Sequence, residues 1–545
     1  YEIYQCDWSS DVCSSDLALK FNTTGYNNTA VGNNANPLNT FGVNNTSLGA
    51  SALAANTTNS NNTAIGGQAL YSSTADNLTA IGYQALYSNT TGGTSTAVGY
   101  RTLYSATTGI NNTAVGYQAL WNTTFGGSKT AVGYPTLSTN VSGSANTAVG
   151  SGALQNTTAS NLTAIGYQAL YSNTTGTYNE SVGYQALYNT TTGSNNIGVG
   201  TTAGYSITYG SQNIAIGRGT LFSNATGSNN TAVGYQVLNS STASNLTAVG
   251  YQALYNNTTG LSNTAVGYQA LYSNTTGAYN TAVGMQASYQ GTIGSRNTNI
   301  GYGAGYGVSD GNDNVFVGYQ SGTNNASNQP ASYSVGIGSL ALTKAQSGQF
   351  NTAVGYKAAY SNTTQSYLTA IGYQAGRDYS PAGADGSGSV FVGANAGLTF
   401  TTGGFSVLVG AGAGQTNTTG SYLTGVGAAA LSNSTVGGTA VGYAAMYSNT
   451  TGTQNTAVGY NTLYANQTGA ANTAVGYQAL ANNTSDENAA FGHRALDKNT
   501  TGSRNVGLGP YVGSANQTGS DNTFVGYAVG FANGDRKSTR LNSSH

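Results

Sequence analysis

Residues 263–277 read Asn-Thr-Ala-Val-Gly-Tyr-Gln-Ala-Leu-Tyr-Ser-Asn-Thr-Thr-Gly, and close variants of this stretch follow one another along the chain. We call the glycine that closes Ala-Val-Gly, or a variant of it, the phase glycine. It occurs thirty times between Gly32 and Gly526, which is a mean step of about 17 residues. A period this regular is typical of one supersecondary unit stacked on copies of itself.

Each unit contains short apolar segments separated by turn residues. Thr-Ala-Val is a β-branched segment ending at glycine, Gln-Ala-Leu-Tyr reads as a second extended segment, and Ser-Asn-Thr-Thr-Gly is rich in turn-forming residues. A glycine in every unit and frequent turns disfavour a helix. The sequence therefore predicts an all-β parallel β-solenoid, or β-roll, of about thirty 17-residue coils with two short strands per coil.

The repeat also predicts which columns of side chains line the core. We expect the aliphatic residue before the phase glycine to point inward, together with the leucine four residues after it. The flanking alanines either fill a narrow core or let a neighbouring chain approach, and the asparagine before the first strand is expected to form a ladder of stacked amides. Examples of the aliphatic position are Ile81, Val98, Val266 and Leu508, with Phe491 as an exception. Examples of the leucine position are Leu86, Leu120 and Leu271, and examples of the asparagine position are Asn146, Asn263 and Asn280.

Tyrosines form two columns that we expect on the surface. The residue after the phase glycine is tyrosine in seventeen of the thirty coils, and its replacement by Arg218 or His493 elsewhere indicates an outward position. A second column lies five residues after the glycine, at Tyr87, Tyr171 and Tyr272, with Trp121 in the same place. Such columns either bind sugar rings or apolar surfaces, or pack on one another along the stack. The candidate surface-binding residues of the first column are Tyr83, Tyr251, Tyr268 and Tyr477.

The two ends of the chain do not follow the repeat. Residues 1–17 and 535–545 resemble translated sequencing adapter, so we expect them to be artefacts and leave them out of the fold prediction. Both cysteines fall in the first segment, and residues 18–534 keep ten acidic and eleven basic residues. We expect residues 18–534 to form one continuous repeat domain, and any signal peptide, anchor or folding domain to lie outside the fragment.

Low charge excludes some classes of function. Only 5% of the residues are charged, and there is neither a basic patch typical of nucleic-acid binding nor an apolar run long enough for a transmembrane helix. The sequence predicts no enzyme, no cofactor and no metal site. Asp486, Glu487 and His493 lie within one coil's length but lack a nucleophile motif, so we interpret them as surface charge.

Two coils are longer than the rest, at residues 319–337 and 373–392. Insertions in a solenoid emerge as loops on one face, which is often the binding face. Asp313, Arg377, Asp378 and Asp385 lie near these loops and are further candidate surface-binding residues. Gly311-Asn312-Asp313 resembles a fragment of a calcium loop without the spacing of a full site, so a solvated loop is the favoured interpretation.

The Asn-Thr-Ala-Val-Gly and Asn-Leu-Thr-Ala-Ile-Gly units resemble the head repeats of trimeric autotransporter adhesins of the YadA type, and similar repeats of bacteriophage tail fibres. That resemblance covers nearly all of residues 18–534, although the family's repeats are usually shorter. It implies a left-handed β-roll that forms homotrimers, is located outside the cell on a bacterial surface or a virion, and attaches to a host-cell, matrix or glycan receptor.

Three functional hypotheses follow from the sequence. The leading one is a structural and adhesive fibre segment without membrane contact of its own. The alternative is an ice-binding β-solenoid, because regular threonine ranks on a flat face bind ice, but a Thr-X-Thr rank is not clear here. A glycan-cleaving enzyme would need the carboxylates of Asp313, Asp378 or Asp385, and paired acids are lacking.

Overall fold

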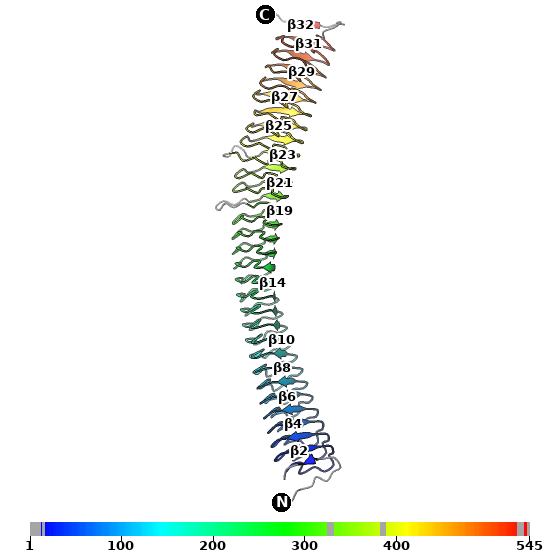
Figure 1. The fold of residues 1–545 in the computed structure, drawn as a ribbon, viewed down its shortest axis with the longest axis vertical. Helices are drawn as coiled ribbons and strands as arrows, with labels where there is room; N and C mark the ends of the chain where they lie inside the picture. The colour runs from blue at the N-terminus through cyan, green and yellow to red at the C-terminus, as the bar shows by residue number, and fades with distance from the viewer. Residues whose placement is uncertain (1–11, 14–16, 324–331, 382–387, 531–538, 542–545) are drawn as a thin grey trace. The chain divides into compact units, whose positions relative to one another are not determined.

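The computed structural model describes residues 12–13, 17–323, 332–381, 388–530 and 539–541, and these contain strands, turns and bends without a helix. The chain divides into two compact units, residues 1–263 and 264–545. In each unit, one short strand per coil lies beside the strand of the next coil (Figure 1). The predicted all-β parallel solenoid with a step of about 17 residues is confirmed.

In the first unit the strands after β1 pair in chain order, in parallel, with equivalent residues opposite each other. For example, Thr96, Ala97 and Val98 pair with Thr113, Ala114 and Val115. The strands are β1 (Val12–Cys13), β2 (Thr29–Val31), β3 (Thr46–Leu48), β4 (Thr63–Ile65), β5 (Thr79–Ile81), β6 (Thr96–Val98), β7 (Thr113–Val115), β8 (Thr130–Val132), β9 (Thr147–Val149), β10 (Thr163–Ile165), β11 (Glu180–Val182), β12 (Ile197–Val199), β13 (Ile214–Ile216), β14 (Thr231–Tyr235) and β15 (Thr247–Tyr251).

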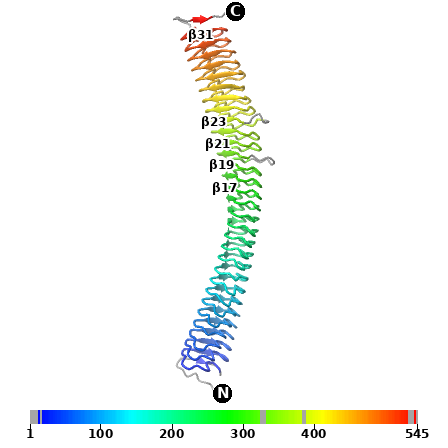
Figure 2. The same ribbon diagram turned by 180° about the vertical axis from the view of Figure 1, so that it is seen from behind.

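The second unit repeats this arrangement, and β32 is added antiparallel to β31. Its strands are β16 (Thr264–Val266), β17 (Thr281–Val283), β18 (Thr298–Ile300), β19 (Val315–Val317), β20 (Val335–Ile337), β21 (Thr352–Val354), β22 (Thr369–Ile371), β23 (Val390–Val392), β24 (Val407–Val409), β25 (Leu423–Val426), β26 (Gly438–Val441), β27 (Asn455–Val458), β28 (Thr473–Val475), β29 (Ala489–Phe491), β30 (Val506–Leu508), β31 (Thr523–Val525) and β32 (Thr539–Leu541). Figure 2 shows the same strands from behind.

The prediction of two strands per coil is wrong, because the Gln-Ala-Leu-Tyr segment is a series of turns. Gln269 and Leu271 have φ values of 53° and 50°, which is the left-handed region, and equivalent residues in other coils repeat this conformation. A backbone that alternates in this way cannot extend as a strand. It still bonds from coil to coil, as the Leu271 N–H does to the Ala287 carbonyl at 2.9 Å.

The prediction that the aliphatic residue before the phase glycine points inward is also wrong. Ala265 is fully buried, whereas Val266 beside it is 36% exposed. Side chains alternate across a strand, so the buried alanine places both of its neighbours on the outer side. Ile81, Phe491 and Leu508 are exposed in the same way, and Val98 is half-buried.

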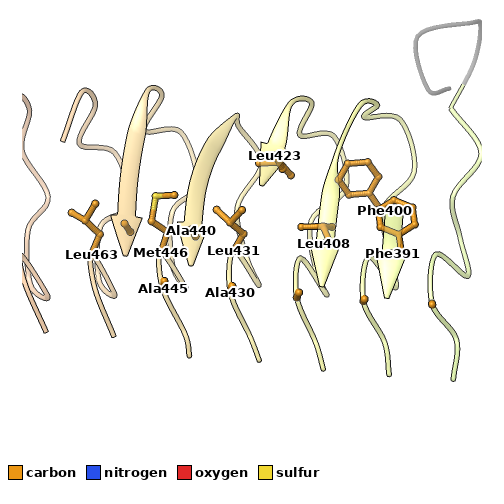
Figure 3. Close-up of a cluster of buried hydrophobic side chains, with 14 of the residues drawn as sticks. Phe391, Phe400, Leu408, Leu423, Ala430, Leu431, Ala440, Ala445, Met446 and Leu463 are labelled. Atoms are coloured by element: carbon orange, nitrogen blue, oxygen red, sulfur yellow. The ribbon is translucent and has the colours of Figure 1, made fainter. Parts of the chain in front are cut away.

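The leucine prediction is confirmed, since Leu86, Leu120 and Leu271 are at most 2% exposed. The core is therefore narrow, built from the strand alanine and from the alanine and leucine of the turn segment. Part of it in the second unit is drawn in Figure 3, where Leu431, Met446 and Leu463 point toward the strands of successive coils. Phe391 and Phe400 enlarge it locally, with ring centroids 5.4 Å apart.

Asparagines four residues before the phase glycine form a buried ladder, as predicted. Its bonds go mainly to the backbone: Asn213 donates its side-chain N–H to the Gly227 carbonyl at 2.9 Å and accepts the Asn230 backbone N–H at 3.1 Å. An amide-to-amide bond also occurs, from Asn213 to Asn196 at 3.1 Å. Each asparagine thus links neighbouring coils where the strand begins.

The phase glycine is required where successive coils approach most closely. Gly82 has a φ of +135°, and a Cβ atom on it would lie 2.3 Å from the carbonyl oxygen of Gly99. Both the positive φ and the short distance to the Gly99 carbonyl oxygen exclude a side chain at this position. The glycine therefore sets the sharp corner at which the strand ends and the turn segment begins.

Candidate functional site

Each coil presents two regular faces to solvent, separated by the corner at the phase glycine. The strand face consists of the residues three and one before that glycine, usually threonine and an aliphatic residue. The tyrosine face consists of the residues one, two and five after it, usually tyrosine, glutamine and tyrosine. The two faces therefore place different chemistry on the surface.

The strand face carries what we call the outer aliphatic column, a column of aliphatic residues with one aromatic member, Phe491. Its members are half-buried to exposed, with Val266 at 36% and Leu508 at 52%. Threonines such as Thr264 lie beside it on the same side of the strand and are partly exposed. Exposed examples in the first unit are Leu48, Ile81, Val115, Val132, Ile165, Val182, Val199 and Ile216.

The first tyrosine column is exposed, as the sequence predicted, and its rings also pack on one another. Tyr83, Tyr251, Tyr268 and Tyr477 are all exposed. The Tyr83 ring stacks on Tyr100 at 5.7 Å, Tyr235 on Tyr251 at 5.3 Å, and Tyr477 on His493 at 5.0 Å. Stacked aromatic pairs contribute on the order of 0.5–1.5 kcal/mol beyond their buried area. Their edges and hydroxyl groups stay available to a ligand.

The second tyrosine column stacks in the same manner. Tyr171, Tyr188, Tyr205 and Phe222 follow each other at centroid distances of 5.2 Å. Burial beside the charged forms of Tyr171 and Tyr205 raises the pKa of the Tyr188 hydroxyl.

Between the two tyrosine columns, glutamine side chains form an amide ladder that the sequence analysis did not anticipate. Gln84 donates to Gln68 at 2.7 Å, and Gln185 donates to Gln168 at 2.9 Å. Arg101, in the same position, donates to Gln84 at 2.8 Å. The signal in the sequence was the recurring glutamine two residues after the phase glycine.

The charged candidates near the long coils do not form one site. Asp313 binds Arg296 of the preceding coil at 2.6 Å, and that hydrogen bond lowers the pKa of the Asp313 carboxyl. Arg377 instead binds its neighbour Asp378, with Nε 2.8 Å from the carboxylate oxygen. Asp385 lies outside the described residues. Because Asp313 is five residues before a phase glycine and Arg377 five after one, they occupy different sides of the coil.

Asp486, Glu487 and His493 also belong to different parts of the coil. Asp486 accepts the backbone N–H of Ala470 at 2.8 Å, whereas the His493 ring is part of the first tyrosine column. In the described residues, no group of three or more His, Cys, Asp or Glu side chains is placed to hold a metal ion. Nor does the described part of the chain offer a helix that could span a bilayer.

Some positions of the asparagine ladder carry another residue, such as Ser95 or Leu162, and Lys129 stands at one of them. It is fully buried, its ammonium donates to the Phe125 carbonyl at 3.1 Å, and burial lowers its pKa to about 8. The sequence analysis did not single it out, although its place four residues before Gly133 marks it as a ladder position. Because burial disfavours the charged form of the amine, the protonated Lys129 side chain destabilises the fold, and this cost decreases as the pH rises.

Comparison with models of known protein families and with curated proteins finds no match for this chain. Its function therefore has to be argued from the two faces of the coil.

Proposed function

We propose that this chain is a segment of a homotrimeric, extracellular adhesive fibre, in which the strand faces of three copies pack together and the tyrosine faces remain outside. The observation that carries the proposal is the outer aliphatic column. A soluble chain rarely exposes a long contiguous apolar stripe unless a partner covers it.

A second and third copy of the same chain are the partners that fit this column best. The column repeats with the coil, so identical copies can match it coil by coil. Threonines beside the valines add short polar groups that pack closely, and only 5% of the chain is charged, so little charge opposes association. The resemblance to trimeric adhesin heads and tail-fibre repeats supports three copies and an extracellular location.

Absolute mass in solution tests this association. The chain weighs 54.9 kDa, so light scattering is expected to give three times that mass. The double variant Val266→Asp with Val283→Asp places carboxylates on the strand face and is expected to keep the fold while weakening or preventing association. Circular dichroism checks that the wild-type protein is folded. If the folded protein has the mass of one chain at every concentration in light scattering, the trimer is refuted.

A matched control uses the same two coils on the other face. Tyr268→Ser with Met285→Ser changes two exposed side chains one residue after the phase glycines. We expect this variant to keep the mass of the wild-type protein. A comparable loss of mass in both variants would show that association does not depend on the strand face.

The adhesive role is supported by the tyrosine face, which presents aromatic edges, hydroxyls and amides in regular columns. These groups are suited to sugar rings and to extended polymers. Beads coated with the chain are expected to bind immobilised polysaccharides or matrix proteins, and Tyr460→Ser with Tyr477→Ser is expected to reduce that binding. Beads that bind none of these surfaces would contradict the adhesive role.

Ice binding is the second candidate, and the strand face favours it. Thr264 and Val266 point outward from one strand and recur at Thr281 and Val283, which makes a regular array of hydroxyl and methyl groups on a parallel sheet. Ice binding needs this face bare, whereas a trimer covers it. Thermal hysteresis of a folded single chain, lost in the Val266→Asp and Val283→Asp variant, would favour the ice-binding function.

A further inference from the structure

The second tyrosine column is interrupted at several places, and one interruption in the second unit, after Tyr306, lasts for two coils. Tyr272, Tyr289 and Tyr306 stack at centroid distances of 5.2 Å. The next two coils place Thr323 and Thr343 at the equivalent position, and the aromatic residue returns only at Tyr360. The stack therefore ends at Tyr306, and the space beyond it that two further tyrosine rings would occupy holds threonine side chains.

The glutamine ladder is interrupted at the same place. Gly303 stands where twelve of the thirty coils carry glutamine, so it supplies no side chain between Gln286 and Gln320. A Cβ atom on Gly303 would make only ordinary contacts, 3.6 Å to Gln320 and 3.8 Å to Thr323. Its φ of +60° is close to the 56° of Gln286, so the backbone already has the conformation that glutamine adopts at this position.

These missing side chains leave a hollow of about 540 Å³ on the tyrosine face. Tyr302 and Tyr306 provide aromatic surface, Gln286 and Gln320 provide amide groups, and Thr323 and Thr343 provide hydroxyls. A volume of this size is within the range of small-ligand sites. In coils that follow the consensus, such as the one with Gln269 and Tyr272, glutamine and tyrosine side chains occupy the corresponding positions.

The far end of the hollow is positively charged. Lys344 lines it and is the one charged side chain among the described lining residues. Its ammonium lies 5.2 Å from the centre of the Tyr360 ring, and Lys357 lies 5.7 Å from the same ring. The Lys344 cation at the edge of an otherwise neutral, hydrogen-bonding hollow favours a ligand that carries a negative charge.

We propose that this hollow binds an acidic pyranose, such as one uronic acid unit of a polysaccharide. The C–H face of the sugar ring packs on Tyr306 in place of the next tyrosine. Its hydroxyl groups bond to the amides of Gln286 and Gln320 and to the threonine hydroxyls, and its carboxylate binds the Lys344 ammonium.

The site would be an attachment point of the proposed adhesive fibre, and it rests on that function. It is formed by a single chain, however, so its occupancy does not require the trimer. Measuring the mass in solution of the same sample separates the two ideas. A trimer that binds no uronate refutes the site alone, and a single chain that binds it refutes the trimer alone.

The test is calorimetric titration of the full chain with a galacturonic acid trisaccharide and, separately, with its fully methyl-esterified form. We expect one site per chain, and affinity for the acid at least about tenfold higher than for the ester. Absence of binding by the acid would overturn the proposal. Equal affinity for the two forms would overturn the role of Lys344.

Variants that restore the consensus repeat fill the hollow without opposing the fold. Gly303→Gln and Thr323→Tyr are each expected to weaken binding at least about tenfold, and Lys344→Gln is expected to remove the preference for the acid. The control is Gly219→Gln, which makes the same change two residues after Gly217, where Phe222 keeps the second column intact. Thermal unfolding checks that each variant is folded. Unchanged affinity in Gly303→Gln and Thr323→Tyr would place the ligand elsewhere.

Discussion

Adjacent glycines in one coil provide a sharp test of why the phase glycine is needed. Gly66 is a phase glycine with a φ of +129°, and a Cβ atom there would lie 2.6 Å from the carbonyl oxygen of Gly82. Gly67, one residue later, has no such restriction, and its Cβ would lie 3.5 Å from the Tyr83 ring. Changing each to alanine adds the same methyl group in two different environments.

The cost of Gly66→Ala has two parts. An unfavourable backbone conformation costs on the order of 1–3 kcal/mol, and forcing an extra carbon into a packed contact costs about 1–3 kcal/mol more. We therefore expect a destabilisation of roughly 2–6 kcal/mol, concentrated in the coils of β4 and β5. Gly67→Ala is expected to be neutral or to stabilise by about 0.4–1 kcal/mol, because it restricts the unfolded chain.

Hydrogen exchange resolved along the sequence is the suitable assay, because stability in a repeat protein varies from one repeat to the next. Gly66→Ala should accelerate exchange of the amides around residues 63–66 and 79–82, and denaturant unfolding should show the loss independently. Equal protection in the two variants would refute the close-contact explanation. So would a Gly66→Ala protein within about 0.5 kcal/mol of the wild type.

Three further changes test other parts of the coil. Thr202 is a β-branched residue with a φ of 54°, so Thr202→Gly is expected to raise the melting temperature relative to Thr201→Gly, its neighbour without positive φ; the reverse order would contradict the left-handed turn segment. Burial lowers the pKa of Lys129 from 10.5 to about 8, so the unfolded state binds more protons between these values, and stability should rise by roughly 2 kcal/mol from pH 7.5 to pH 9.5. Lys129→Asn should remove that rise, and chemical denaturation of both proteins from pH 7.5 to 9.5 measures the difference. Asn213→Ala leaves buried backbone groups without partners and should lower the free energy of unfolding by about 2–4 kcal/mol. Asn213→Ser should cost less, because serine keeps an acceptor, as Ser95 does for the Asn112 N–H. Equal thermal unfolding of the two variants would argue against the ladder.

The repeat, the parallel stacking and the outward tyrosines could be predicted because each leaves a regular trace in the sequence. The period gives the coil, and the replacement of tyrosine by Arg218 or His493 indicates an exposed position. The second strand could not be distinguished from turns by apolar pattern alone. A clue was present, since Gly219, Gly303 and Gly376 occur at the positions that require positive φ.

The direction of the strand side chains was mistaken because large aliphatic residues are usually buried. In this coil the leucine of the turn segment already fills the interior, so the strand has room only for alanine, as at Ala265. Valine is therefore displaced to the outside, where it becomes the strongest evidence for association. The hollow near Tyr306 could not be predicted from single motifs. It forms because successive coils lack tyrosine and glutamine side chains, and only the stacked structure brings these positions together.

In-register stacking of similar coils also affects how the number of repeats can change during evolution. A deletion or duplication of one 17-residue unit rejoins equivalent positions, so Thr96, which faces Thr113, could face Thr130 with the same backbone bonds. Slippage between similar DNA repeats can therefore lengthen or shorten this protein without creating a new packing problem. The hollow is the exception, since losing the coil that carries Gly303 would remove it in a single genetic event.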